Sequence, residues 1–365
     1  MIFIFLRKCT YLLFFPSITL LSYLLFNRDL LLTFDSYNFL CGANTFKSTL
    51  KLFMCDFTPM VLSPPGYSIF LSAFILSPTT LHFTYILTTV LMYGLTLYCW
   101  YSIIKQEITD DFVFVFASLQ MAAALPLFYV HLFVWSEGLF VFLISTGLFS
   151  YYRFKVQNNV YWLILFATAF GLSVTVKYIG LLIFVSIVLG SLLSNKNAFR
   201  KYQYFILCIP LLSFIGVILN NYNSSGSFTG IRPFLNRDGF EILQSCSGVI
   251  FNWVAPANLI PSIFWVLFIL GFSLVTLYFS KASFIWASTF IGFFLFLFIS
   301  AWRTDIEYDE RLFVPIFPFF VMLIFNLLQN IPNFKSVFYF RNAFLIYWTV
   351  YSFLRLGKNV IEWAY

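Results

Sequence analysis

Two carboxylates stand beside apolar runs of the sequence and could take part in acid–base chemistry. Asp35 lies in FDSYNFL, just past the first apolar run, and Glu137 opens a later one in HLFVWSEGLFVF. A carboxylate at a membrane boundary can take a proton from an attacking hydroxyl or amine. Because placing an acid there costs free energy, its presence suggests a function. Two structural alternatives stay open: Asp35 as a helix N-cap, and Glu137 as a favourable charge at a helix N-terminus capped by Ser136.

Two cations occupy comparable positions and could hold a phosphate. Lys177 lies within the apolar stretch LSVTVKYIGLL, and Arg311 lies at the membrane edge in RTDIEYDERLFVPIFPF. A cation inside an apolar run needs an anionic partner, and a guanidinium can bind phosphate through two parallel hydrogen bonds. The alternatives are that Lys177 snorkels to the interface, and that Arg311 pairs with Asp309 or Glu310 in a solvated acidic loop.

Other polar side chains in the connections between apolar runs are candidates for substrate contacts. Tyr67 follows two prolines and a glycine in SPPGYSIFLSAF, where the prolines direct the chain and Gly66 lets another group approach closely. The same residues also suit an ordinary helix start. Asp56 lies in the first long connection, and Arg232 lies in a Gly-, Ser- and Asn-rich loop that could close over a substrate or simply connect two helices.

The composition of the chain places these residues in a membrane protein. Of 365 residues, 61% are hydrophobic and 10% are charged, whereas a soluble domain is roughly half apolar and a quarter charged. The net charge of +7 comes from basic residues scattered between apolar runs, so it predicts no nucleic-acid partner. The six cysteines have no metal-like spacing. Cys41, Cys55 and Cys246 fall in polar loops, where one disulfide is an alternative to free thiols.

The apolar runs predict an all-α polytopic membrane protein with about 10–11 spanning helices. A span needs roughly 20 apolar residues, and runs of that kind occur at 10–31, 79–101, 112–129, 135–152, 160–176, 178–194, 203–220, 260–279, 284–301, 312–328 and 340–354. Segment 65–77 is too short to cross, so we expect the long first loop to carry short interfacial helices. We expect residues 1–365 to form a single transmembrane domain without a separate soluble domain.

The charges in the connections predict an orientation. With the N-terminus in the cytoplasm, most basic residues fall on the cytoplasmic side, which is the usual bias of membrane proteins. The opposite side then receives the longest polar connections, 28–64, 221–259 and 302–311, together with most of the acids. These acids are Asp29, Asp35, Asp56, Glu137, Asp238, Glu241, Asp305, Glu307, Asp309 and Glu310.

Five short motifs, taken in order, resemble the GT-C fold glycosyltransferases, in particular bacterial membrane enzymes of the glycosyltransferase family 39 type, related to protein O-mannosyltransferases and lipid A aminoarabinose transferases. The motifs are Asp35 and Tyr37 in FDSYNFLCGA, PPGYSIFLSAF at 64–74, Ser136-Glu137, KYIG at 177–180 and RLFVPIFPF at 311–319. The resemblance covers about residues 10–325. Lys177 stands where it leads us to expect arginine, and the first-loop acid has no second acid beside it.

The resemblance implies a polyprenyl-phosphate sugar donor, a glycan, lipid or protein acceptor, and an active face on the non-cytoplasmic side of the cell membrane. It implies inverting single displacement with Asp35 as general base, while Glu137 orients the acceptor. Arg311 and Lys177 would hold the donor phosphate within the membrane lipids. Tyr37, Tyr67, Asp56 and Arg232 would contact substrates. No cofactor is required, and an Mg²⁺ or Mn²⁺ ion at Glu137 is an optional addition.

Two other function classes fit the same sequence. A transporter or lipid flippase would also carry charges along a path through the membrane, although the charges here gather toward one face and no internal repeat is visible. A non-catalytic membrane assembly subunit would need none of the site residues to act together. The convergence of Asp35, Glu137 and Arg311 on one external cavity would favour the enzyme.

Overall fold

The computed structural model describes residues 7, 10–28, 30–61, 63–74, 78–194, 199, 203–228, 237–279, 284–304, 309–330 and 335–364. Within these ranges the chain forms α-helices, short 3₁₀ segments and two isolated β-bridges, with no strand. The predicted all-α architecture is therefore confirmed. Arg232 lies outside the described residues.

Each apolar run predicted from the sequence coincides with one helix or with consecutive helical segments. The elements are η1 (Thr10–Leu13), α2 (Phe14–Phe26), α3 (Phe34–Thr49), α4 (Gly66–Ser72), α5 (Pro78–Glu107), α6 (Asp111–Ala122), α7 (Leu125–Leu132), α8 (Ser136–Gln157), α9 (Val160–Val176), α10 (Gly180–Ser194), α11 (Gln203–Leu207), α12 (Ile209–Ser225), α13 (Gly239–Phe251), η2 (Ala257–Leu259), α14 (Ser262–Phe279), α15 (Phe284–Arg303), α16 (Glu310–Phe313), η3 (Val314–Ile316), α17 (Phe317–Gln329) and α18 (Lys335–Ala364).

Six helical segments of the described chain are long and apolar enough to cross a membrane. They are His82–Glu107, Asp111–Leu132, Ser136–Gln157, Gln203–Ser225, Phe284–Arg303 and Glu310–Gln329. Shorter apolar helices accompany them at Thr10–Phe26, Val160–Val176, Gly180–Leu193 and Gly239–Phe251. The chain is therefore a multi-pass membrane protein.

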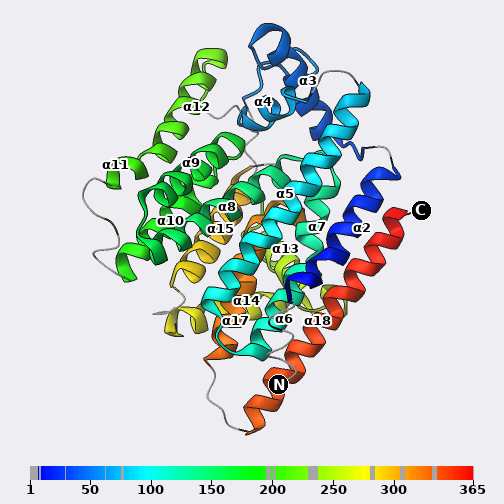
Figure 1. Ribbon diagram of the computed structural model, residues 1–365, viewed down its shortest axis with the longest axis vertical. Helices are drawn as coiled ribbons and strands as arrows, with labels where there is room; N and C mark the ends of the chain where they lie inside the picture. Colours follow the sequence, from blue (N-terminus) through cyan, green and yellow to red (C-terminus); the bar gives the residue numbers. More distant parts are fainter. Residues whose placement is uncertain are drawn as a thin grey trace.

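The helices form one bundle, with α3 and α4 across one of its ends (Figure 1). Helix α8 packs between α5 and α9, α9 continues the layer to α10 and α12, and α10 contacts α15. Aromatic rings fill the interior, where Trp100, Trp286 and Phe319 contact one another. Large flat side chains bury much area with few rotatable bonds, which suits a core without water.

Different ion pairs mark the two ends of the bundle. At one end, Arg7 pairs with Asp111 at 2.6 Å and Arg341 pairs with Asp110 at 3.1 Å. We call this the Arg7 end. The other end carries α3, α4 and the start of α8, and we call it the α3 end. This division matches the two groups of charges that the sequence assigned to opposite sides of the membrane.

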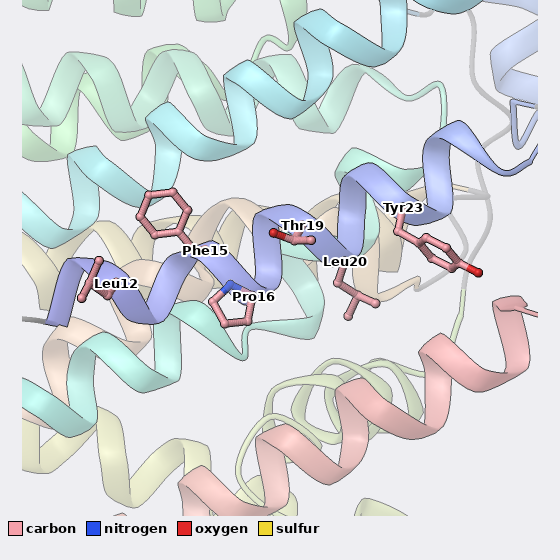
Figure 2. Close-up of a pocket in the computed structure, with 6 residues that line it drawn as sticks. All are labelled: Leu12, Phe15, Pro16, Thr19, Leu20 and Tyr23. Carbon is pink, nitrogen blue, oxygen red and sulfur yellow. The ribbon is translucent and has the colours of Figure 1, made fainter.

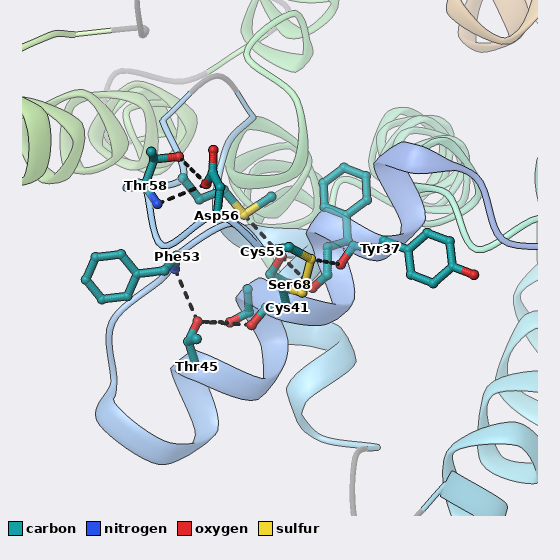
Figure 3. The surroundings of a disulfide bond; sticks show 11 residues. Tyr37, Cys41, Thr45, Phe53, Cys55, Asp56, Thr58 and Ser68 are labelled. Atoms are coloured by element: carbon teal, nitrogen blue, oxygen red, sulfur yellow. Dashed lines mark hydrogen bonds between the residues drawn. A yellow bond between two sulfur atoms is a disulfide. The ribbon is translucent and has the colours of Figure 1, made fainter.

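The cap at the α3 end is held by a disulfide between Cys41 and Cys55 (Figure 3). The bond ties the middle of α3 to the connection that follows it. A bridge between Phe53 and Pro59 closes the same connection into a tight turn. Of the two alternatives for the loop cysteines, the structure therefore shows the disulfide.

The connection 221–259 differs from the polar loop predicted from sequence. It contains α13, which packs against α14, α15 and α16. Cys246 lies in α13 and is fully buried, so its placement in a polar loop was wrong. The apolar stretch of α13 is short and Asp238 caps its N-terminus by accepting from the Phe240 N–H, which made the segment look like a loop.

An open apolar groove of about 740 Å³ runs along the outer face of η1 and α2. Figure 2 shows its lining residues on this one helical stretch, with Leu12, Phe15 and Pro16 at one end and Leu20 and Tyr23 at the other. No charged side chain lines the groove. It therefore lacks the groups that could hold a phosphate, and the candidate chemistry lies elsewhere.

Candidate functional site

Glu137 and Lys177 form a buried ion pair at the α3 end of the bundle. Glu137 lies in the first turn of α8 with its side chain 5% exposed, and Lys177 Nζ is 2.8 Å from its Oε1. Lys177 is the residue at which α9 ends, in extended conformation. The lysine therefore has the anionic partner that a cation in an apolar run needs. Ser136 donates to Glu137 Oε2 at 3.3 Å and does not cap α8.

Arg311 and Asp35 form a second ion pair, joined by Asp309. Arg311 Nη1 lies 2.7 Å from Asp35 Oδ2, and Arg311 Nε lies 3.1 Å from Asp309 Oδ2. The contact with Asp309 is close enough for an ion pair but is not aligned as a hydrogen bond. Arg311 thus pairs with Asp309, as one alternative expected, but it also pairs with Asp35. Glu310 pairs with Arg355 instead.

Asp35 is not the N-cap of α3. Thr33 is the N-cap and forms a capping box with Ser36, in which each side chain accepts a hydrogen bond from the backbone N–H of the other residue. Asp35 lies in the first turn, where its carboxylate is 45% exposed and directed to Arg311. The sequence alternative for Asp35 was therefore wrong, since the neighbouring threonine does the capping.

The two ion pairs belong to one charge cluster, because Arg311 also interacts electrostatically with Glu137. The packing of η3 against α8 brings Arg311 toward the start of α8. The cluster contains three carboxylates and two cations. Each cation already has a carboxylate partner, so an incoming anion has to compete for it.

Trp135 lies against the Arg311 side of this cluster. The Arg311 guanidinium lies over its ring, 5.1 Å from the centroid. Its indole N–H donates to Thr33 Oγ1 at 2.8 Å. The sequence reasoning did not single out Trp135 or Thr33, and a tryptophan before Ser-Glu or a threonine before Phe-Asp carries no distinctive signal.

The Pro-Pro-Gly-Tyr turn packs closely against the end of α9, which accounts for its glycine. A Cβ at Gly66 would lie 2.4 Å from Thr175 Oγ1 and 2.7 Å from the Thr175 backbone. Only glycine permits this approach, which sets the first loop directly beside Lys177. Tyr178 strengthens the junction, because its hydroxyl donates to the Val61 carbonyl and accepts from Asn221 Nδ2.

Tyr67 is buried beneath this junction. Its ring packs edge-on against Phe39, with centroids 4.9 Å apart, and the side chain is 1% exposed. Its hydroxyl interacts with Tyr85 and Glu137 but has no well-aligned hydrogen bond. Burial raises the pKa of Tyr67 well above its usual value, so the phenol stays neutral and can donate a hydrogen bond.

The other predicted substrate contacts are not brought to the charge cluster by any described contact. Tyr37 is 55% exposed, and its side chain points away from the disulfide (Figure 3). Asp56 is exposed and accepts from the Thr58 hydroxyl and N–H, and these hydrogen bonds lower its pKa. It therefore stabilises the turn that Cys55 anchors. Their substrate roles, and that of Arg232, stay predictions.

A second ion pair network lies next to Arg311 and was not anticipated. Arg355 from α18 pairs with Glu310 at 2.6 Å, and the Trp253 indole donates to the same carboxylate at 2.9 Å. Glu310 is thereby bound to α18 and to the turn that follows α13. Its neighbour Arg311 is left to face Asp35.

Comparisons with solved structures show a similar arrangement of helices. The structure of ArnT from Cupriavidus metallidurans in the apo state superposes with a TM-score of 0.59 at 14% identity, over 88% of this chain and 59% of ArnT. The same enzyme bound to undecaprenyl phosphate gives 0.58 at 14% identity, over 91% and 60%. The chain has a GT-C-like fold. It spans less than two thirds of the length of ArnT. No protein-family model and no curated protein sequence matches the chain.

Proposed function

We propose that this protein is a membrane glycosyltransferase that transfers a sugar from a polyprenyl-phosphate donor to an acceptor at the α3 end of the bundle. The observation that carries the proposal is the convergence of Asp35, Glu137, Lys177 and Arg311, from four separate segments, into one charge cluster. The fold supports it, since ArnT has a similar arrangement of helices and was solved with undecaprenyl phosphate.

The donor phosphate binds by exchange with a carboxylate. Arg311 presents a planar fork of N–H groups, which fits two phosphate oxygens, but one of these groups is now on Asp35. When phosphate takes the guanidinium, Asp35 loses its partner and its lone pairs become free to accept a proton. Donor binding thus unmasks the base, and the acceptor is activated only when a donor is present. Lys177 adds a second positive charge at the site.

The reaction is a single displacement at the anomeric carbon. The acceptor oxygen or nitrogen forms a bond to that carbon while the bond to the donor phosphate oxygen breaks. Asp35 takes the proton from the acceptor, and the electron pair of the broken bond leaves with polyprenyl phosphate. Arg311 and Lys177 stabilise the charge that develops on the leaving phosphate. One displacement inverts the anomeric carbon.

Glu137 and Tyr67 orient the acceptor in this proposal. Glu137 keeps an oxygen, Oε2, that Lys177 does not use. Tyr67 provides a neutral hydroxyl nearby. The acceptor is a hydroxyl or amine of a glycan, lipid or protein.

The optional Mg²⁺ or Mn²⁺ ion does not fit the described site. Among the residues that the structure describes, no three His, Cys, Asp or Glu side chains lie together as metal ligands. Glu137 and Asp35 are each neutralised by a cation instead. We derive no step through a metal ion.

The non-cytoplasmic location of the site is supported by the Cys41–Cys55 disulfide, which lies at the α3 end. Disulfides persist in oxidising compartments and are rare in the cytoplasm. The Arg7 end, with its basic residues, then faces the cytoplasm.

Binding and transfer test the proposal separately. Binding of undecaprenyl phosphate to purified protein should weaken more in Arg311→Ala than in Arg311→Lys, because a point charge retains part of the attraction, and Lys177→Ala should weaken it too. Asp35→Asn should bind the lipid at least as tightly, since the competing carboxylate is gone. With a panel of undecaprenyl-phosphate sugars, its transfer should fall by about 10²–10⁴.

Lys358→Ala is the control, because Lys358 is exposed and pairs only with its neighbour Glu362 on α18. Equal binding by all variants would put the phosphate elsewhere and favour a transporter. Full transfer by Asp35→Asn would remove the general base assignment and turn attention to Glu137 or Asp56.

A further inference from the structure

Trp135 contacts Arg311 directly and contacts the start of α3, which carries Asp35, through Thr33. It precedes α8 in extended conformation and is 4% exposed. Its ring lies under the Arg311 guanidinium and stacks on Phe133, with centroids 4.4 Å apart and 12° between the planes. Its N–H reaches Thr33.

The hydrogen bond to Thr33 bears on the position of Asp35. Thr33 caps α3, and Asp35 lies two residues later in the first turn. The chain just before the cap is also tied to the chain just before Trp135, since the Val134 N–H donates to the Leu31 carbonyl at 3.3 Å. The two helix starts are therefore joined by backbone at one point and by the indole at the next.

The contact with Arg311 leaves the phosphate-binding edge free. An aromatic ring attracts a guanidinium through its flat face, whereas phosphate and carboxylate bind its N–H groups at the edge. Phosphate can therefore replace Asp35 without displacing Trp135. The ring then keeps the guanidinium in place, and the indole N–H keeps the start of α3 in place, after the ion pair between them has opened.

We propose that Trp135 is a positioning residue that holds Arg311 and Asp35 in register when the donor phosphate separates them. The inference rests on the proposed transfer reaction. It assigns separate tasks to two parts of one side chain: the ring serves phosphate binding, and the N–H serves the base.

Two substitutions divide these tasks. Trp135→Phe keeps an aromatic face and removes the N–H, so kcat should fall roughly 10- to 100-fold, as expected when a reacting group is misplaced, while the affinity for undecaprenyl phosphate and the KM for donor stay near wild type. Trp135→Leu removes the ring as well, so lipid affinity should also fall, by about 2- to 30-fold. Thr33→Val should reproduce the kcat loss of Trp135→Phe, and Thr33→Ser should restore activity.

Trp100→Phe is the matched control, because Trp100 is also buried and donates its N–H to a side-chain hydroxyl, that of Ser145, at 2.8 Å within the bundle. A kcat loss in Trp100→Phe equal to that in Trp135→Phe would show a general packing effect and overturn the proposal. Wild-type kcat in Trp135→Phe, or additive losses in the Trp135→Phe, Thr33→Val double variant, would also overturn it. If the wild-type protein neither binds undecaprenyl phosphate nor transfers a sugar, the proposed function fails, and the positioning role falls with it.

Discussion

Glu137 forms an ion pair with Lys177 at the start of α8, and Arg311 also interacts with it electrostatically. Burying a carboxylate without a partner lowers the free energy of unfolding, because the charge loses its hydration and gains no compensating interaction. The ion pair therefore contributes to stability independently of any role in catalysis.

Lys177→Met should destabilise the protein. Removing one partner of a buried pair costs about 3–5 kcal/mol, and we expect the low end because Lys177 is 24% exposed. The apparent Tm in detergent should fall, and adding Glu137→Gln to the same protein should recover much of the loss. Lys358→Met, on an exposed pair, should leave the Tm unchanged. An equal Tm for wild type and Lys177→Met would mean that Glu137 is solvated or protonated in the folded protein.

The sequence identified the charged residues of the site but not their partners. Asp35, Glu137, Lys177 and Arg311 stand out because charges are rare in an apolar chain, and motif order pointed to the fold. Their pairing depends on how α8, α9 and α16 meet, which local pattern does not encode. Trp135 could not have been predicted, since its role depends on contacts from two distant segments.

At the scale of elements, the position of α4 depends on contact between Gly66 and the end of α9. Because a side chain there would overlap the backbone of Thr175, the loop would have to move. The movement would separate Tyr67 from its contacts and loosen the junction at Lys177.

Gly66→Ala should therefore destabilise the cap and lower donor binding together. Gly216→Ala in α12 provides the comparison, because a Cβ there meets nothing within 4 Å and alanine favours a helix by about 0.5–1 kcal/mol. Limited proteolysis should cut the first loop faster in Gly66→Ala and at the wild-type rate in Gly216→Ala. Unchanged cleavage in both would mean that α4 accommodates the methyl group by a small shift.

The disulfide should contribute to the stability of the same cap. Closing a loop of this length, with the two cysteines 14 positions apart in the sequence, contributes about 3 kcal/mol in the chain-entropy model. Cys41→Ser with Cys55→Ser should lower the Tm and increase proteolysis between 50 and 60. Thiol labelling of the protein in membranes, followed by mass measurement, reports whether the bond is present. Cys41 and Cys55 should take up label only after reduction. Free thiols at both positions would contradict the structure.

Helix positions were predictable where an apolar run had charged or polar ends, as in α8, α9 and α15. Helix α13 was missed because its apolar run is short and begins with Asp238 and Glu241. Its side chains are buried by contacts with α14, α15 and α16, which the local sequence does not indicate. A short helix was expected in segment 65–77, and α4 forms it over Gly66–Ser72. Its location at the membrane interface stays a prediction.

At the scale of the whole molecule, charges are sorted between the two ends. The Arg7 end carries the pairs of Asp110 and Asp111, and the α3 end carries those of Asp35, Glu137 and Glu310. Arg7 and Arg341, both predicted for the cytoplasmic side, lie at the Arg7 end, as the positive-inside rule leads us to expect.

Cysteine accessibility decides which end faces outward. In a Cys208→Ser background, an impermeant thiol reagent should label Ser224→Cys in intact cells, since Ser224 is exposed at the end of α12. It should label Asn158→Cys, at the opposite end of the bundle, only after permeabilisation. Gly230→Cys, in the connection after α12, should behave like Ser224→Cys. The reverse pattern would invert the orientation and place the site in the cytoplasm.

The disulfide lies wholly in the connection between α2 and α5. In the proposed orientation both thiols emerge from the membrane once the earliest spans are inserted, while Lys177 and Arg311 have yet to be translated. Oxidation at that stage closes the cap before any residue that will pair with it exists. We expect the later helices to assemble against this preformed surface, so a host with less thiol-oxidising capacity should yield less folded protein.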